Sequence, residues 1–164
     1  MRIKSYNVDD RMVTELGRFA ILWNLFEHSQ CENSCNPKII REIAPHLYID
    51  NAAQTKLARV LNERCDRFGQ DISEYVDSGM YPRNAKKATA EDKELMEAFL
   101  EQRQGDLRCG CLLVIARLRN NLMHGLKCVE ELNDQYKLFC AVNDVLESIE
   151  GAPDEQVQHR RRDR

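Results

Sequence analysis

The chain has 164 residues, the length of one compact domain that can bury a core of its own. Charged residues make up 31% of it and aromatic residues 7%, and no window holds the roughly 18 uninterrupted apolar residues of a membrane span, so we predict a globular, cytoplasmic protein without a membrane partner. The formal net charge of -3 argues against a protein that coats nucleic acid with its whole surface.

Helical spacing dominates the sequence, because apolar residues recur at steps of three and four while alternating β-branched runs and hairpin turns are almost absent. The first helix is predicted to begin near Asp9 or Asp10, either of which can cap it. Its inward stripe contains Met12, Leu16, Phe19, Trp23 and Phe26. Off this stripe lie Ile21, Leu22 and Leu25. A helix that is apolar on two sides needs a second cover, and we expect another protomer to provide it.

Two further helices are predicted from their end signals. Asn36 and Pro37 form a cap and a first turn for a short helix, which Pro45 should end. Asp50 then starts a longer helix, and Gly69 closes it. The predicted inward face of this longer helix contains Ala53, Leu57, Val60, Leu61 and Phe68.

The central helix is predicted at about residues 106–124 and contains the most apolar stretch of the chain, CGCLLVIA. Before it, residues 78–89 are predicted to form a loop, since the segment SGMYPRNAKKAT is rich in turn residues. Thr89 with Asp92 then resembles a capping box, which opens a helix that ends near Gly105.

A last amphipathic helix is predicted at residues 132–149. Together these elements predict an all-α fold, a single bundle of about five to six helices without an internal repeat. We place this helical bundle domain at residues 1–150. Residues 151–164, which end in HRRRDR, are predicted to be a basic, flexible tail.

The cysteines do not suggest a disulfide framework, because their number is odd and four of them lie in helical apolar patterns. These four, predicted to be reduced, are Cys65, Cys109, Cys111 and Cys140. In HSQCENSC the spacing of His28, Cys31 and Cys35 would suit three zinc ligands, but a fourth ligand and a C-x-x-C pair are missing. We therefore favour a polar helix end and predict no metal and no other cofactor.

The central helix finishes unusually, with the polar sequence RLRNNLMHGLK after its apolar stretch. On an ideal helix Arg119 falls on the same arc as Leu112, Ile115, Leu118 and Leu122. A guanidinium on a core-facing stripe needs an anion beside it. Two anions fit: a bound phosphate, or a structural carboxylate such as Glu15.

Asn120 and His124 are four residues apart, so the amide can hydrogen-bond the imidazole and fix its tautomer. Gly125 suits the C-terminal cap of this helix, and the free carbonyls at that end favour a protonated imidazole. His124 is therefore suited to exchange a proton near neutral pH. The simpler interpretation is a histidine that only caps the helix.

Basic residues also gather around this segment, with few acidic residues between them: Arg103, Arg108, Arg117, Arg119 and Lys127. A local positive field of this kind guides a polyanion to one cleft, whatever the net charge of the whole chain. The alternative is an ordinary solvated face whose charges are paired.

Residues 119–125, RNNLMHG, resemble the signature of the HEPN superfamily (higher eukaryotes and prokaryotes nucleotide-binding): an arginine, a polar residue, and a histidine after four to six intervening positions. The signature stands near the end of a long late helix of an all-helical bundle in that family, which fits the elements predicted above. RFAILWNLFEHS also resembles the aromatic-rich first helix of some members. The resemblance covers about residues 9–150.

The resemblance implies a metal-independent endoribonuclease of the toxin or antiviral-defence type. Arg119, Asn120 and His124 would be the family's arginine, polar residue and histidine, and therefore the catalytic residues. Attack of the RNA 2′-hydroxyl needs proton transfer at two oxygens and a cation beside the developing charge, which histidine and arginine provide without a metal. The predicted RNA-binding residues are Arg117 and Lys127.

One motif histidine per chain suggests that two chains face each other, so we expect a symmetric homodimer with the site in its cleft. On an ideal helix Arg119 and His124 point about 140° apart and lie about 7.5 Å apart along the axis. A site within one chain and a composite site, with Arg119 of one chain and His124 of the other, both remain open. A cognate antitoxin or regulatory protein is a further expected partner.

Two other functions fit the same sequence. The main alternative is a non-catalytic helical module that keeps the motif to bind a nucleotide or a protein. A third is a subunit whose apolar helix face docks onto a larger partner, which would have no activity by itself.

Overall fold

A computed structural model of the chain describes residues 2–3, 6–80, 88–123 and 131–150. Its described part is an all-α helical bundle, which confirms the predicted fold class. Among the predicted site residues, His124 and Lys127 lie outside the described ranges, as does the predicted tail at 151–164. No helix in the described ranges combines the length and the apolar character that crossing a bilayer requires.

Helix α1 spans Asp10–Cys31, and Asp9 occupies its N-cap as predicted. The Asp9 side chain makes no capping hydrogen bond; its carboxylate lies 3.5 Å from the Arg11 guanidinium instead. Four of the five predicted stripe residues are buried, namely Met12, Phe19, Trp23 and Phe26, and Leu16 is half-buried.

The second apolar side of α1 is narrower than its sequence indicates. Leu22 lies off the inward stripe but is buried in the core of the bundle, so the expectation that another protomer covers it is wrong. It neighbours Trp23 and Phe26 on a face that the bundle covers more broadly than one stripe. Ile21 and Leu25 are 65% and 48% exposed, which leaves a pair of apolar side chains one turn apart on the surface.

A short hairpin precedes α1, although the sequence led us to expect almost no strand. Strand β1 (Arg2–Ile3) pairs antiparallel with β2 (Tyr6–Asn7). Strands of two residues are too short to show the alternation by which strands are recognised. The hairpin is tied to the far end of the chain, because Asn133 donates from Nδ2 to the Asn7 carbonyl at 3.1 Å.

The predicted caps of α2 and α3 are confirmed. Helix α2 spans Pro37–Ile43 and begins where the Asn36 side chain accepts a hydrogen bond from the Ile39 amide; the short 3₁₀ helix η1, Ala44–His46, follows it. Helix α3 spans Asn51–Phe68, with the Asp50 carboxylate 2.8 Å from the Ala53 amide and Gly69 closing it at φ 62°. The inward placement of Phe68 is wrong: this last residue of α3 is 57% exposed.

The segment after α3 is more ordered than predicted. Helix α4 (Ile72–Glu74) continues into the π-helical turn η2 (Tyr75–Gly79). No element was predicted for the first residues of η2, and its last two residues fall in the predicted loop. Tyr75, Val76 and Met80 are buried, and this burial explains why the turn is held. Residues 81–87 of the predicted loop lie outside the described ranges.

Helix α5 spans Ala90–Leu100, and the Thr89 hydroxyl accepts from the Asp92 amide at 3.1 Å, as the capping box predicts. The helix ends at Leu100, earlier than the predicted end near Gly105. Asp92 does not complete the box, because its buried carboxylate pairs with Arg41 of α2. The N-terminus of α5 is thereby fastened to α2.

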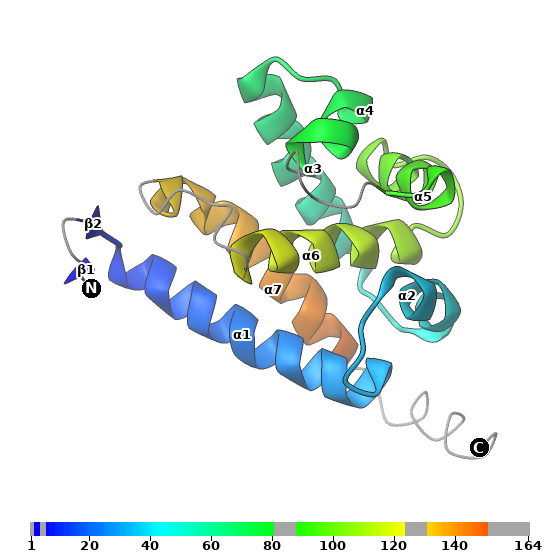
Figure 1. Cartoon of the computed structure of the whole chain (residues 1–164), viewed down its shortest axis with the longest axis horizontal. Helices are drawn as coiled ribbons and strands as arrows, with labels where there is room; N and C mark the ends of the chain where they lie inside the picture. The colour runs from blue at the N-terminus through cyan, green and yellow to red at the C-terminus, as the bar shows by residue number, and fades with distance from the viewer. Residues whose placement is uncertain (1, 4–5, 81–87, 124–130, 151–164) are drawn as a thin grey trace.

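Helices α6 (Arg108–Met123) and α7 (Tyr136–Glu150, preceded by the 3₁₀ turn η4, Asn133–Gln135) complete the bundle. In Figure 1, α1 and α7 run side by side, and α6 crosses the middle of the view between α1 and the group of α3, α4 and α5. Helix α5 packs closely on α6 at Gly110, where an added Cβ would lie 2.0 Å from the Leu95 carbonyl oxygen. Because α6 is central, its polar C-terminal turns lie between α1 on one side and the end of η2 on the other.

Candidate functional site

The last two turns of α6, residues 117–123, present polar side chains on two opposite sides. We call this segment the motif turns. Arg117 and Asn121 are one turn apart and reach the chain at Met80, just after η2. Arg119 lies on the other side and reaches α1. Alternate residues of a helix point about 200° apart, so the motif turns are forced to divide their polar groups in this way.

Among the described residues, Arg119 has three neighbours with which it interacts. Its Nη1 donates to the Asn120 side-chain oxygen at 3.1 Å, and its guanidinium carbon lies 5.8 Å from the centre of the Trp23 ring. Its Nη2 lies 3.9 Å from a carboxylate oxygen of Glu27. The guanidinium therefore has an anion near it, but no carboxylate of the described residues is within hydrogen-bond distance of it.

The carboxylate beside Arg119 is Glu27, and the Glu15 pairing considered from the sequence is wrong. Glu15 lies on α1 three turns earlier, where it accepts from Asn143 Nδ2 at 2.8 Å and pairs with Arg18 at 3.2 Å. Asn143 is fully buried on α7, so its amide needs this partner. Glu15 consequently serves the contact between α1 and α7.

Glu27 is fixed by contacts of its own. One carboxylate oxygen accepts from the Trp23 indole N–H at 3.2 Å, and the other accepts from the Cys35 backbone amide at 3.5 Å. These donors orient the carboxylate without requiring Arg119. Glu27 thus presents a partly satisfied negative charge to the motif turns, and its side chain is 22% exposed.

Two donors of Arg119 are left without a hydrogen bond among the described residues. Its Nε is buried and has no hydrogen-bond partner there, and its Nη2 approaches only the distant Glu27. The side chain is 31% exposed, so solvent or a ligand reaches part of it. Because Nε itself is buried, a ligand reaches the guanidinium through its Nη groups, and two N–H groups of a guanidinium match two oxygens of a phosphate or a carboxylate.

The motif residues after Met123 are not part of the described structure, and this applies to both His124 and Lys127. The predicted hydrogen bond between Asn120 and the His124 ring therefore stays a prediction. Within the described residues, the oxygen of Asn120 accepts from Arg119. This contact joins the first two residues of the motif and makes Asn120 an orienting group for the guanidinium.

Arg117, predicted to bind RNA, has a structural contact. Its Nε donates to the Met80 carbonyl at 2.6 Å, and Asn121 Nδ2 donates to the same oxygen at 3.0 Å. A carbonyl with two donors is fully satisfied, so these two side chains anchor the end of η2 to α6. Contact of Arg117 with RNA stays a prediction.

The basic cluster around the motif is partly neutralised. Arg103 pairs with Glu94 and Glu101, and Arg108 pairs with Asp106 at 2.6 Å. These ion pairs favour the interpretation of an ordinary solvated face for this part of the cluster. Arg117 donates to an uncharged carbonyl and Arg119 lies 3.9 Å from Glu27, so these two arginines retain positive charge at the motif turns.

The cysteine predictions divide in two. Cys65, Cys109, Cys111 and Cys140 are free thiols, as predicted. Burial raises the pKa of the Cys65 and Cys109 thiols to about 11, which keeps both protonated at neutral pH. Cys31 and Cys35 form a disulfide at the C-terminus of α1, which corrects the prediction of a polar helix end without a disulfide. His28 Nδ1 lies 3.2 Å from the Asn33 side-chain oxygen. No group of three or more metal-ligating side chains occurs in the described part of the chain.

Neither of the α1 residues that contact Arg119 was predicted from the sequence as part of the site. Trp23 was assigned to the core alone, and Glu27 was not singled out. Their spacing of one turn was a usable signal, since it allows the indole N–H to bind the carboxylate.

Comparison of the chain with protein-family models, with curated proteins and with solved structures finds no match.

Proposed function

We propose that the chain is a HEPN-like, metal-independent endoribonuclease of the toxin or antiviral-defence type, with Arg119, Asn120 and His124 as its catalytic residues. The observation that carries this proposal is the state of Arg119. Its guanidinium lies at the end of α6 between an indole face and an orienting amide, with two donors that make no hydrogen bond in the described part of the chain. An arginine in this state is prepared to bind a further anion.

The proposed chemistry assigns one task to each residue. Arg119 binds the scissile phosphate through two parallel N–H donors and stabilises the charge that develops on it. Asn120 keeps the guanidinium oriented through the Nη1 contact. His124 transfers a proton at the attacking 2′-hydroxyl or at the leaving oxygen. The residue types supply acid–base and electrostatic catalysis, so we expect no requirement for a divalent ion.

A symmetric homodimer is part of the proposal, because a second chain would supply the second histidine. The exposed pair Ile21 and Leu25 supports it, since a second copy would cover these side chains. Light scattering at tens of micromolar protein is expected to give the dimer mass. A monomer mass at this concentration would contradict this part of the proposal.

A non-catalytic module that binds a nucleotide or a protein is the second candidate function. The observation that favours it is Glu27, whose carboxylate lies 3.9 Å from Arg119 and would make the arginine a structural group. In the ribonuclease proposal, phosphate displaces this carboxylate as the partner of Arg119. The two candidates therefore predict different effects of substitutions at Arg119 and Glu27. Such substitutions change RNA cleavage or RNA binding if the chain is a ribonuclease, and stability if the two residues form a structural pair.

The direct test is to incubate the purified protein with total RNA in the presence of a chelator. We expect cleavage by the wild type and loss of cleavage in His124→Ala. The control is His46→Ala, which removes an exposed imidazole distant in sequence from the motif and should cleave normally. Cleavage that requires Mg²⁺ or Mn²⁺, or equal cleavage by wild type and His124→Ala, would contradict the proposed mechanism.

Expression in a bacterial host gives a second test, because an uncontrolled ribonuclease damages the cell that makes it. We expect wild type to slow growth and His124→Ala to relieve the defect. A cytoplasmic site of action and a cognate antitoxin or regulatory protein belong to the same proposal. Equal toxicity of the two proteins would favour the binding module.

A further inference from the structure

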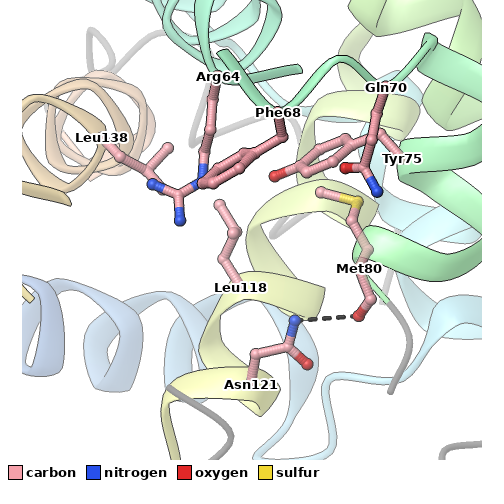
Figure 2. A pocket seen from close by; sticks show the side chains of 8 residues that line it. All are labelled: Arg64, Phe68, Gln70, Tyr75, Met80, Leu118, Asn121 and Leu138. Carbon is pink, nitrogen blue, oxygen red and sulfur yellow. Dashed lines mark hydrogen bonds between the residues drawn. The ribbon is translucent and has the colours of Figure 1, made fainter. Parts of the chain in front are cut away.

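A cavity of about 360 Å³ lies between α3, η2, α6 and α7, on the side of α6 that carries Asn121. Figure 2 shows its walls: Arg64 and Leu138 on one side of the view, and Tyr75 and Met80 on the other, with Leu118 and Phe68 between them. Its volume is near the lower end of the range of about 300–1,000 Å³ that is typical of small-molecule sites. The cavity is therefore large enough for a ligand of one or two rings.

The apolar part of the wall provides flat contact area. Leu118, Leu138 and Met80 are buried and supply apolar lining. Phe68, a residue that is 57% exposed, stands at the edge of the cavity and not in the core. An exposed aromatic residue beside a buried apolar lining is a surface on which a flat ligand stacks.

Among the described residues that line the cavity, Arg64 is the one cation. The Arg64 guanidinium lies 5.3 Å from the centre of the Phe68 ring, and within the described ranges no carboxylate pairs with it. Burial raises the pKa of Tyr75 to about 12, so its hydroxyl remains a neutral donor at neutral pH. The side-chain oxygen of Asn121 is buried and has no hydrogen-bond partner among the described residues, while its nitrogen donates to Met80.

We propose that this cavity binds a small organic anion with a flat apolar body, such as an aromatic carboxylate. Arg64 binds the carboxylate with its planar fork of donors. The body stacks on Phe68 and lies against Leu118, so that apolar area is removed from water.

The cavity lies on the opposite side of α6 from Arg119. Arg119 faces Trp23 and Glu27 of α1, whereas Asn121 faces Met80 and the cavity. Ligand binding is measured without RNA, so its result does not depend on whether the chain cleaves RNA.

The experiment titrates the full chain with 2-naphthoate in a calorimeter. We expect a Kd on the order of 100 µM or tighter. Uncharged 2-naphthamide has the same body and should bind at least about tenfold more weakly, because it loses the charge interaction with Arg64. Arg64→Gln should weaken naphthoate binding by a similar factor, and the control Arg59→Gln, an exposed arginine of the same helix, should stay within about twofold of wild type.

The position of the ligand is checked by methyl NMR. Naphthoate should shift the methyl signals of Met80, Leu118 and Leu138 and leave those of Ile21 and Leu25 unchanged. Arg64→Lys keeps the charge and should bind with intermediate affinity, which tests the charge even if the glutamine variant is unstable. Absence of heat and of shifts up to about 1 mM, equal affinity for the acid and the amide, or shifts elsewhere would overturn the proposal.

Discussion

The two halves of α6 differ in what surrounds them. In the first half, Cys111–Ile115 are five consecutive buried residues, so neighbours cover the helix on every side. At Gly110 the backbone of α5 comes so close that a side chain does not fit. In the second half, the polar groups of residues 117–123 reach two different neighbours, α1 and the end of η2.

The two halves of α6 therefore make different kinds of contact, apolar packing in the first and polar contacts in the second. The apolar half holds the bundle together through packed area, where position matters to a fraction of an ångström. In the polar half, Arg117 and Asn121 satisfy a backbone carbonyl, while Arg119 retains donors without partners. We therefore expect substitutions in the first half of α6, and at Arg117 and Asn121, to change stability. Substitutions at Arg119 should change the proposed RNA cleavage.

The largest effect is expected from Gly110→Ala in the apolar half. The new methyl group would lie 2.0 Å from the Leu95 carbonyl oxygen, so α5 and α6 must separate. We expect the free energy of unfolding to fall by about 3 kcal/mol, which lowers Tm by about 6 °C or more.

The control for this change is Gly17→Ala on α1, where an added Cβ has nothing within 4 Å. That variant should gain about 0.5–1 kcal/mol, because alanine favours a helix more than glycine does. Thermal melts of both variants decide the matter. A Gly110→Ala protein as stable as wild type would show that α5 and α6 are not packed as described.

Arg119→Lys should have the next largest effect, and the effect should be on RNA cleavage. Lysine keeps the charge but loses the planar pair of donors, so we expect cleavage to fall by about 10²-fold. Melting temperature and cleavage are measured on the same sample. If Arg119 is only a structural partner of Glu27, stability and activity should fall together; near-normal cleavage would remove Arg119 from the site.

Asn121→Ala should reduce stability moderately and leave RNA cleavage unchanged. The substitution removes one of two donors to the Met80 carbonyl, and Arg117 still satisfies that oxygen. We therefore expect a loss of about 1 kcal/mol, or a Tm lower by about 2–4 °C.

The matched control is Asn24→Ala on α1, whose amide also donates to a backbone carbonyl but is exposed. Its stability should change by less than about 0.5 kcal/mol. A large fall in cleavage by Asn121→Ala, without a change in Tm, would contradict the assignment of Arg119 to catalysis and of Asn121 to stability alone.

Glu27→Gln should have the smallest effect. The carboxylate competes with phosphate for Arg119, so its neutral replacement should strengthen RNA binding by about threefold at low salt. The glutamine oxygen still accepts from the Trp23 indole, which limits the loss of stability. Fluorescence anisotropy with a labelled RNA measures the change.

The control is Glu42→Gln, which makes the same change in net charge at an exposed position of α2. It should bind RNA about as wild type does. Lower stability of Glu27→Gln with no gain in RNA affinity would favour the structural pair and the binding module.

Much of the fold was predictable because the signals are local. The caps at Asn36, Asp50 and Thr89 involve an amide three residues away, so the sequence around them contains both partners. Phe68 and Leu22 were misplaced because the width of a buried face depends on which helices cover it. The π-helical turn at Tyr75–Gly79 was missed because its own sequence has no distinctive spacing and its order comes from burial.

The sequence by itself determined the helices, their order and the presence of an arginine where the central helix turns polar. Only the tertiary structure decided what this arginine meets. A side chain of its length can reach carboxylates on several turns of α1, and the packing of α1 against α7 assigns Glu15 to Asn143 and leaves Glu27 for Arg119. The cavity beside Asn121 likewise forms from three stretches of the chain, at residues 64–80, 118–121 and 138, and such long-range pairings have no local signal along the chain.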